Sequence, residues 1–354
     1  MKSKLPVATV LVALICHASG LQAQEDNAVS IGGYGEMLFS SDDSGDTLDL
    51  YRAIVYVGYQ FDSSWSFTSE IEVEHQDEIA MEQAFLQYDS GNDWGVRFGH
   101  MLVPMGLINE VHEPTTFWSA NRPQTERLIL PSTWHENGVG GFGRIGDFDW
   151  RAYALTGFDA AGLNIEESGM RGGRQNGSRA AADNLALTAR LDYRGITGLL
   201  LGVSMWSGDS DQAGTGPGGS DEGFATTIWD VHGQYDQGPL RIRGVWADAE
   251  VEDAVLLPTS SASDSLSGWY IEAGWDLFAG RDFANQAPQA LTPFVRFESI
   301  DLQADSLVDT AEDRTTIGLA WQPHEQIIFK LDWTAVGSAV RNEDVVQAAM
   351  GYVF

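Results

Sequence analysis

The chain contains 354 residues, of which 43% are hydrophobic and 20% charged, with 51 acidic and 20 basic side chains. The formal net charge of -31 excludes a nucleic-acid-binding protein, because neutralising phosphates requires a basic surface. A mean hydropathy of -0.17 excludes a membrane protein built from many apolar helices. The single Cys excludes a disulfide framework, and the 39 Gly residues with 11% aromatic residues favour strands and turns over a helical enzyme.

The first predicted element is a secretory signal peptide at residues 1–23. Two lysines precede an apolar stretch at 5–15, which is too short to span a bilayer as a helix. The small residue Ala23 fits a cleavage site, which places Cys16 in the removed peptide. We therefore expect residues 24–354 to be exported into the periplasm as one mature domain.

From residue 28 onward, apolar and polar residues alternate in runs of roughly ten, the weak signature of a transmembrane β-strand. In one run, Phe67, Ile71 and Val73 alternate with acidic residues. Sixteen strands are expected, at 29–39, 47–61, 64–75, 81–89, 93–100, 136–146, 148–158, 183–194, 197–207, 223–236, 239–249, 266–278, 290–300, 311–322, 325–337 and 344–354.

Three further features distinguish a membrane barrel from a soluble β-domain, which also alternates. Connections after even-numbered strands are short except for 279–289, whereas those after odd-numbered strands are mostly long and acidic, as in outer-membrane barrels. Aromatic residues such as Trp94 and Trp206 lie near strand ends, where interface girdles are expected. The last strand ends with Tyr352 and Phe354 on an apolar face, which resembles the C-terminal insertion signal of bacterial outer-membrane proteins. The sequence therefore predicts an all-β fold, a 16-stranded antiparallel transmembrane β-barrel.

The connection at 101–135 is the longest in the chain, and it carries apolar residues such as Phe117 and Trp118 together with four prolines. Loops of this length in a compact fold are usually functional. By strand count this is the third external loop, which in 16-stranded porins folds into the lumen and narrows it. We therefore expect 101–135 to be an inward-folded constriction loop.

The same region carries a family resemblance. The stretch 99–106, followed by Glu110 or Glu113, is similar to the phosphate-selective porin O/P family, which has a Gly-x4-Pro-x-Gly run after a strand. In that family an aromatic and Arg segment and a strand with alternating glycines follow, here 117–122 and 136–143. The resemblance implies a trimeric outer-membrane channel for small solutes. The phosphate-specific members carry many lysines near the mouth, whereas the mature chain here has only one Lys.

Strand alternation assigns most charged strand residues to the lumen, because a charge facing lipid costs roughly 2–4 kcal/mol at the midplane. The predicted pore-lining and constriction residues are Arg97, Arg122, Arg127, Arg144, Arg151, Arg190, Glu110, Glu113 and Glu126. A separate acidic lumen wall is expected from Glu70, Glu72 and Glu74. Bases outnumber acids near the loop, which predicts a weak anion preference despite the acidic exterior. The alternative is that each Arg pairs with a neighbouring acid such as Asp149 or Asp192.

No catalytic residue, cofactor or metal site is predicted, and the chain is not expected to be an enzyme. His112-Glu113 is not followed by a second His one turn later, so the zinc-protease motif fails. The predicted function is passive diffusion of small hydrophilic solutes and ions; a phosphate- or polyphosphate-selective porin and a non-conducting structural or adhesive barrel are the alternatives. The expected partners are those solutes or anions, outer-membrane lipid and lipopolysaccharide, the barrel-assembly machinery and further copies of the chain in a homotrimer.

Overall fold

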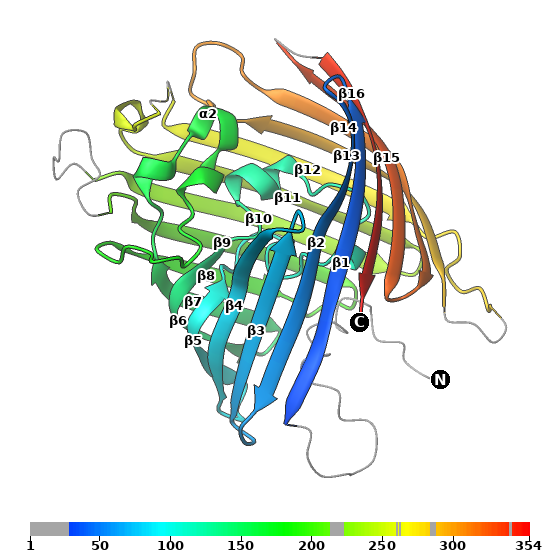
Figure 1. Cartoon of the computed structure of the whole chain (residues 1–354), viewed down its shortest axis with the longest axis horizontal. Helices are drawn as coiled ribbons and strands as arrows, with labels where there is room; N and C mark the ends of the chain where they lie inside the picture. The colour runs from blue at the N-terminus through cyan, green and yellow to red at the C-terminus, as the bar shows by residue number, and fades with distance from the viewer. Residues whose placement is uncertain (1–27, 213–222, 260, 262, 284–287, 340–341) are drawn as a thin grey trace.

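The structure is a computed structural model, and it describes residues 28–212, 223–259, 261, 263–283, 288–339 and 342–354. Within these residues, sixteen strands form one closed barrel in which consecutive strands pair antiparallel and β1 closes the ring against β16 (Figure 1). The predicted signal peptide at 1–23 lies outside the described residues.

All sixteen expected strands are confirmed, with differences of a few residues at their ends. The strands are β1 (Val29–Asp42), β2 (Gly45–Gln60), β3 (Trp65–Glu74), β4 (Glu78–Asp89), β5 (Trp94–Leu102), β6 (His135–Ile145), β7 (Phe148–Thr156), β8 (Leu185–Tyr193), β9 (Leu199–Asp209), β10 (Ala225–Gln237), β11 (Leu240–Val251), β12 (Ser265–Trp275), β13 (Ala290–Asp301), β14 (Glu312–His324), β15 (Ile327–Ser338) and β16 (Asn342–Val353).

Helical structure in the described residues is limited to single turns within the connections. These are η1 (Pro114–Thr116), η2 (Thr125–Ile129), η3 (Ala160–Gly162), α2 (Ile165–Ser168), η4 (Met170–Gly173) and η5 (Ala254–Leu256). None of the described helices is long and apolar enough to cross a bilayer.

The two faces of the wall differ in polarity, as the alternation predicts. On β9, Leu201, Val203 and Met205 point outward and are each 50% exposed, whereas the intervening residues are buried. The prediction that Trp206 belongs to an outer aromatic girdle is wrong, because its position in this alternation turns it inward, where it is fully buried. Trp94 does lie on the outer face, with 45% of its surface exposed.

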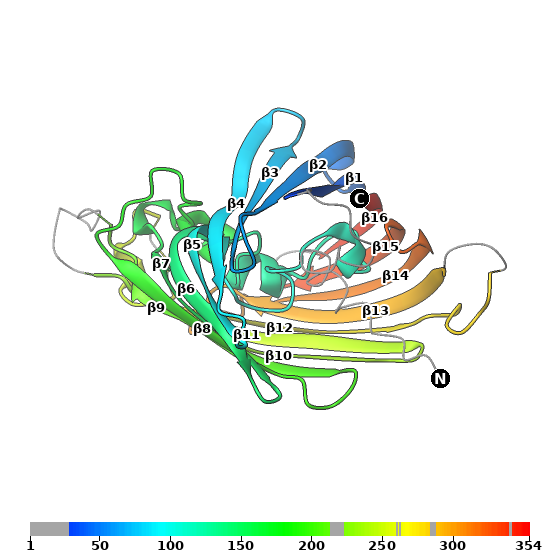
Figure 2. The ribbon, with the colours of Figure 1, turned by 90° about the horizontal axis from the view of Figure 1, so that it is seen from below.

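The interior of the barrel is occupied by residues 103–134, which we call the inward segment. Figure 2 shows its two helical turns, in teal, inside the ring of strands. Here η1 contacts β1, β15 and β16, while η2 contacts β11, β12 and β13. The segment therefore touches strands from both halves of the chain.

A second connection, 157–184, packs over the same end of the barrel. Its η4 contacts η2 of the inward segment, and Arg174 donates a hydrogen bond of 2.7 Å to the Thr133 carbonyl. The largest hydrophobic cluster lies between these two connections and the wall, where Phe158 stacks on Trp134 and packs at a tilt against Trp206. The main core of the protein is thus at one mouth of the barrel.

Candidate functional site

Basic side chains of the wall hold the inward segment by its backbone carbonyls. The pairs are Arg52 with His112 (2.8 Å), Arg243 with Thr116 (3.1 Å), Lys330 with Ser119 (3.1 Å), Arg296 with Asn121 (3.3 Å) and Arg190 with Gly106. The donors belong to β2, β11, β15, β13 and β8, so they approach the segment from several sides.

Acidic wall side chains hold its backbone N–H groups in the same way. Gly106 donates to Asp230 at 3.2 Å, Ala120 donates to Asp332 at 2.6 Å, and Gln124 donates to Glu298. Buried backbone groups outside regular structure need such partners, because water does not reach them. Much of the lumen charge is therefore engaged in fixing the segment in place.

Glu126 closes the segment on itself. Its carboxylate accepts hydrogen bonds from the N–H groups of Leu107 (2.9 Å) and Ile108 (3.3 Å) and from the Tyr270 hydroxyl (3.1 Å). Burial raises the pKa of Glu126 above its usual range. Gly106 lies against it at a φ of 66°, and a Cβ there would come within 2.3 Å of a Glu126 carboxylate oxygen, so only glycine fits.

One group of predicted pore residues does come together. Glu110 accepts from Arg151 Nε at 2.9 Å and lies 3.7 Å from Arg190 Nη1. Both arginines also pair with Asp192, at 3.3 Å and 2.9 Å. Arg97 joins this group through Tyr153 of β7, whose hydroxyl it contacts at 3.3 Å.

Arg144 is not part of that group, which corrects the prediction that it flanks the loop. Strand β6 begins at the inward segment, and Arg144 comes nine residues after its first residue, roughly 30 Å along the strand at about 3.4 Å per residue. It lies beside the short turn at 146–147, where it pairs with Asp149 at 2.6 Å and is 61% exposed. The prediction followed the order of the strands and took no account of position along each one.

Arg122 and Arg127 lie on the inward segment, where Arg122 is half-buried and Arg127 is exposed. Arg127 lines a cavity of about 470 Å³ between the segment, the 157–184 connection and β14. The charged residues lining this cavity are Arg127, Arg171, Arg314, Glu166, Glu167 and Glu312. Positive and negative groups are balanced there.

Several wall arginines pair with an acid on the same or an adjacent strand. Three buried examples are Arg52 with Glu36 (3.1 Å), Arg243 with Glu272 (2.7 Å) and Arg296 with Glu298 (3.2 Å). The alternative considered from the sequence, local pairing, therefore describes these positions. The positive charge of the lumen-facing arginines is therefore largely neutralised by these acids.

The predicted acidic wall of Glu70, Glu72 and Glu74 lacks such pairing with arginine among the described residues. Glu70 and Glu72 are buried, Glu74 is half-buried at the end of β3, and none of them forms an ion pair with Arg or Lys in the described chain. Glu113 of the inward segment faces this side and accepts from the Tyr56 hydroxyl at 3.2 Å.

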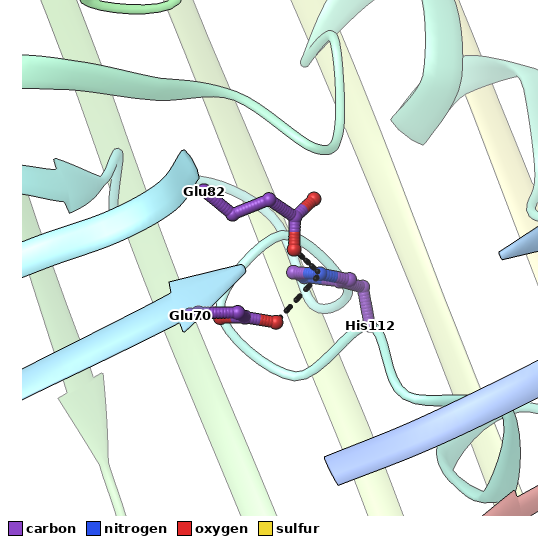
Figure 3. A group of neighbouring side chains, drawn as sticks. All are labelled: Glu70, Glu82 and His112. Atoms are coloured by element: carbon purple, nitrogen blue, oxygen red, sulfur yellow. Dashed lines mark hydrogen bonds and ion pairs between the residues drawn. The ribbon is translucent and has the colours of Figure 1, made fainter. Parts of the chain in front are cut away.

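The sequence reasoning missed Glu82, which lies opposite Glu70 and beside His112 (Figure 3). A β-bulge explains the omission: the register between β3 and β4 shifts after Glu70, which pairs with Gln83, while Ile71 pairs with Met81. Glu82 is the extra residue, and it turns inward with no exposed surface.

No protein-family model matches the chain. An uncharacterized protein of Aquifex aeolicus (strain VF5) is 31% identical over 361 residues, which cover 94% of this chain and 81% of that protein. Among solved structures, the Salmonella typhi OmpF complex with daunomycin superposes with a TM-score of 0.64 at 9% identity, covering 92% of this chain and 97% of that one. The anion-selective porin from Comamonas acidovorans gives 0.61 at 11% identity, covering 92% and 99%. The outer-membrane channel DcaP of Acinetobacter baumannii gives 0.59 at 11% identity, covering 94% and 100%. These likenesses identify the fold as the porin barrel.

Proposed function

We propose that this chain, which belongs to the same family as the uncharacterized Aquifex aeolicus protein, is an outer-membrane channel for passive diffusion of small hydrophilic solutes and ions. The observation that carries the proposal is a closed barrel with an apolar outer face and a charged inner face. A soluble domain would not expose large apolar side chains on every strand of a closed sheet. The porin-like fold also supports a location in the outer membrane.

The inward segment is proposed to set the size of solute that passes. Its backbone is hydrogen-bonded to wall strands on several sides, so it does not move freely out of the lumen. A fixed segment narrows the path to the space left beside it, including the cavity at Arg127.

We further propose that any anion preference is weak. Arg151 and Arg190 share Glu110 and Asp192, so their fields largely cancel. Arg97 and Arg127 remain as positive groups near the segment. Phosphate selectivity would need a run of arginines free to bind the anion, and the paired arginines favour general diffusion over that alternative.

Assembly into a homotrimer is also part of the proposal.

Conductance in planar bilayers tests the central proposal. Purified protein should give steady, step-like currents in symmetrical salt. The opposing hypothesis is a structural or adhesive barrel, which the filled mouth of the barrel also fits, and silent bilayers after verified insertion would favour it.

Removal of residues 112–127 is expected to raise single-channel conductance markedly, because it takes away the part of the segment that crosses to β15 and β16. The wall groups Arg52, Arg243 and Lys330 would then face open water, which solvates them without a carbonyl partner. Removal of the exposed loop tip at 306–309 serves as the control and should leave conductance unchanged. Equal conductance in both deletion variants would contradict a limiting role for the segment.

A further inference from the structure

Three side chains from three different segments meet inside the barrel (Figure 3): Glu70 of β3, Glu82 of β4 and His112 of the inward segment. His112 Nε2 lies 3.1 Å from a Glu82 carboxylate oxygen and 4.0 Å from a Glu70 carboxylate oxygen. One ligand atom from each residue lies within 4.8 Å of the other two. The three side chains are at most 3% exposed, so water does not screen their charges.

The other nitrogen of the His112 ring fixes how the ring presents itself to these carboxylates. Nδ1 lies 2.9 Å from the backbone carbonyl of Asn109, and a carbonyl oxygen can only accept a hydrogen bond. Nδ1 therefore carries a hydrogen, and in the neutral ring Nε2 directs its lone pair at the carboxylate oxygens. Two lone pairs at this distance repel each other, so a proton or a metal ion must lie between them.

The carboxylates also have unused oxygens. Gln83 donates to one Glu70 oxygen at 2.6 Å, while the other Glu70 oxygen has no hydrogen-bond donor among the described residues. The same holds for one oxygen of Glu82. Arg52, a wall base that acts on Glu82 electrostatically, is paired with Glu36. An unpaired carboxylate is costly to bury, so this pocket has too little positive charge for its acids.

We propose that Glu70, Glu82 and His112 bind a divalent first-row transition-metal cation of the Zn²⁺ type. Such an ion prefers one or more imidazole nitrogens together with carboxylate oxygens, and bond lengths of about 2.0–2.2 Å in a tetrahedron place its ligand atoms ~3.4 Å apart. The observed separations of 3.1 and 4.0 Å bracket that value. The Asn109 carbonyl supplies the outer hydrogen bond that usually orients a metal-bound His.

The donor set selects against Mg²⁺ and Ca²⁺, which take six or more oxygen ligands. The ion would fasten the inward segment to β3 and β4, the side of the wall where Glu70 and Glu72 lack an Arg or Lys partner in the described chain. This role goes beyond the proposed channel function and does not depend on whether the barrel conducts.

His232 provides an internal comparison. It also lies between two acids, but Asp230 contacts Nδ1 at 2.6 Å and Asp192 contacts Nε2 at 2.8 Å. The two nitrogens face opposite directions, so the two carboxylates cannot share one ion with a single nitrogen. A protonated ring satisfies both acids at His232, whereas His112 turns only one nitrogen toward both of its acids.

The test is a titration of chelator-stripped, detergent-folded full-length protein with Zn²⁺, followed by calorimetry. We expect one equivalent to bind tightly to the wild type. His112→Gln, Glu82→Gln and Glu70→Gln should each lower the affinity at least about 10-fold, a loss that even an outer-shell change can cause. Tetrahedral Co²⁺ absorption should appear in the wild type and disappear in the same variants.

His75→Gln is the matched control, because it removes an exposed His that also lies beside an acid. It should bind Zn²⁺ like the wild type. Where His112→Gln does not fold, judged by heat-modifiable mobility in electrophoresis, the two Glu→Gln variants preserve side-chain size and give the same comparison. Wild-type affinity in both Glu→Gln variants, or a wild type that takes up no stoichiometric Zn²⁺, overturns the site whether or not the protein conducts ions.

Discussion

Glu110 neutralises two arginines that otherwise face the lumen. Its carboxylate lies 2.9 Å from Arg151 and 3.7 Å from Arg190, and it is carried by the inward segment while the arginines belong to the wall. The segment therefore contributes charge as well as bulk to the interior. A single carboxylate at this position balances positive groups from β7 and β8.

Glu110→Gln should shift the reversal potential in a salt gradient toward anion selectivity, because Asp192 is then the one acidic partner left to both arginines among the described residues. Asp149→Asn is a matched control, since Asp149 also pairs with two arginines, Arg144 at 2.6 Å and Arg194 at 3.0 Å. Those arginines are 61% and 44% exposed at the opposite mouth, where salt screens them, so a much smaller shift is expected. Equal shifts in the two variants would show that Glu110 does not govern permeation.

For individual side chains, the sequence predicts which residues face inward but not which of them contact one another. Glu110, Arg151 and Arg190 were all assigned to the pore, and they form one cluster. Glu82 was not assigned to the lumen because a β-bulge interrupts the alternation on which the assignment depends. A bulge cannot be recognised from a single sequence. Arg144 was misplaced because strand order says nothing about height along the barrel axis.

Among the structural elements, the connection at 157–184 does more than link β7 to β8. Phe158 lies 4.7 Å from both Trp134 of the inward segment and Trp206 of β9, measured between ring centroids. The three rings join the two connections to the wall in one packed layer. Positioning of the inward segment thus depends on a second connection that lies over it.

Trp206→Ala should destabilise the folded barrel by roughly 3–5 kcal/mol, the range for removing a large aromatic side chain from a core. Trp269→Ala on the outer face should cost less, because 42% of that side chain is already exposed. The measurement is the denaturant midpoint for unfolding from lipid vesicles, followed by Trp fluorescence. A loss at Trp206 no greater than that at Trp269 would mean that the aromatic layer adds little stability.

The strands were predictable and the connections were only partly so, for a physical reason. A strand of the barrel wall is recognised by alternation, because successive side chains face the lipid and the lumen in turn. The apolar content of 101–135 indicated an inward loop for the same reason, since Phe117 and Trp118 are poorly suited to water. Residues 157–184 carry no comparable excess of aromatic residues, so their packing against Trp206 could not be inferred.

For the molecule as a whole, the barrel closes where its first and last strands meet. Phe354 and Gly33 exchange two backbone hydrogen bonds, with N–H to carbonyl distances of 2.9 and 3.0 Å. Tyr352 and Phe354 also present stacked rings on the outer face, with centroids 6.4 Å apart. The chain terminus is therefore part of the seam.

Deletion of Phe354, or Phe354→Asp, should leave the protein in the periplasm at much reduced outer-membrane levels. The deletion removes the last backbone pair of the seam, whereas Phe354→Asp keeps that pair and places a charge where an aromatic side chain is expected to direct insertion. Tyr352→Phe keeps the ring and should reach normal levels. Fractionation with heat-modifiability in electrophoresis measures both, and normal membrane levels of the Phe354→Asp variant would argue against a terminal assembly signal.

The contacts of the inward segment also impose an order on folding. Its residues are synthesised early, yet Ala120 binds Asp332 and Asn121 binds Gln347, partners more than 200 positions later in the chain. Contacts over such separations form slowly, because the intervening chain must first be organised. These two contacts consequently cannot form until β15 and β16 have joined the sheet. Completion of the wall and final placement of the interior are therefore coupled, because residues 120–121 cannot be fixed before the last two strands are in place.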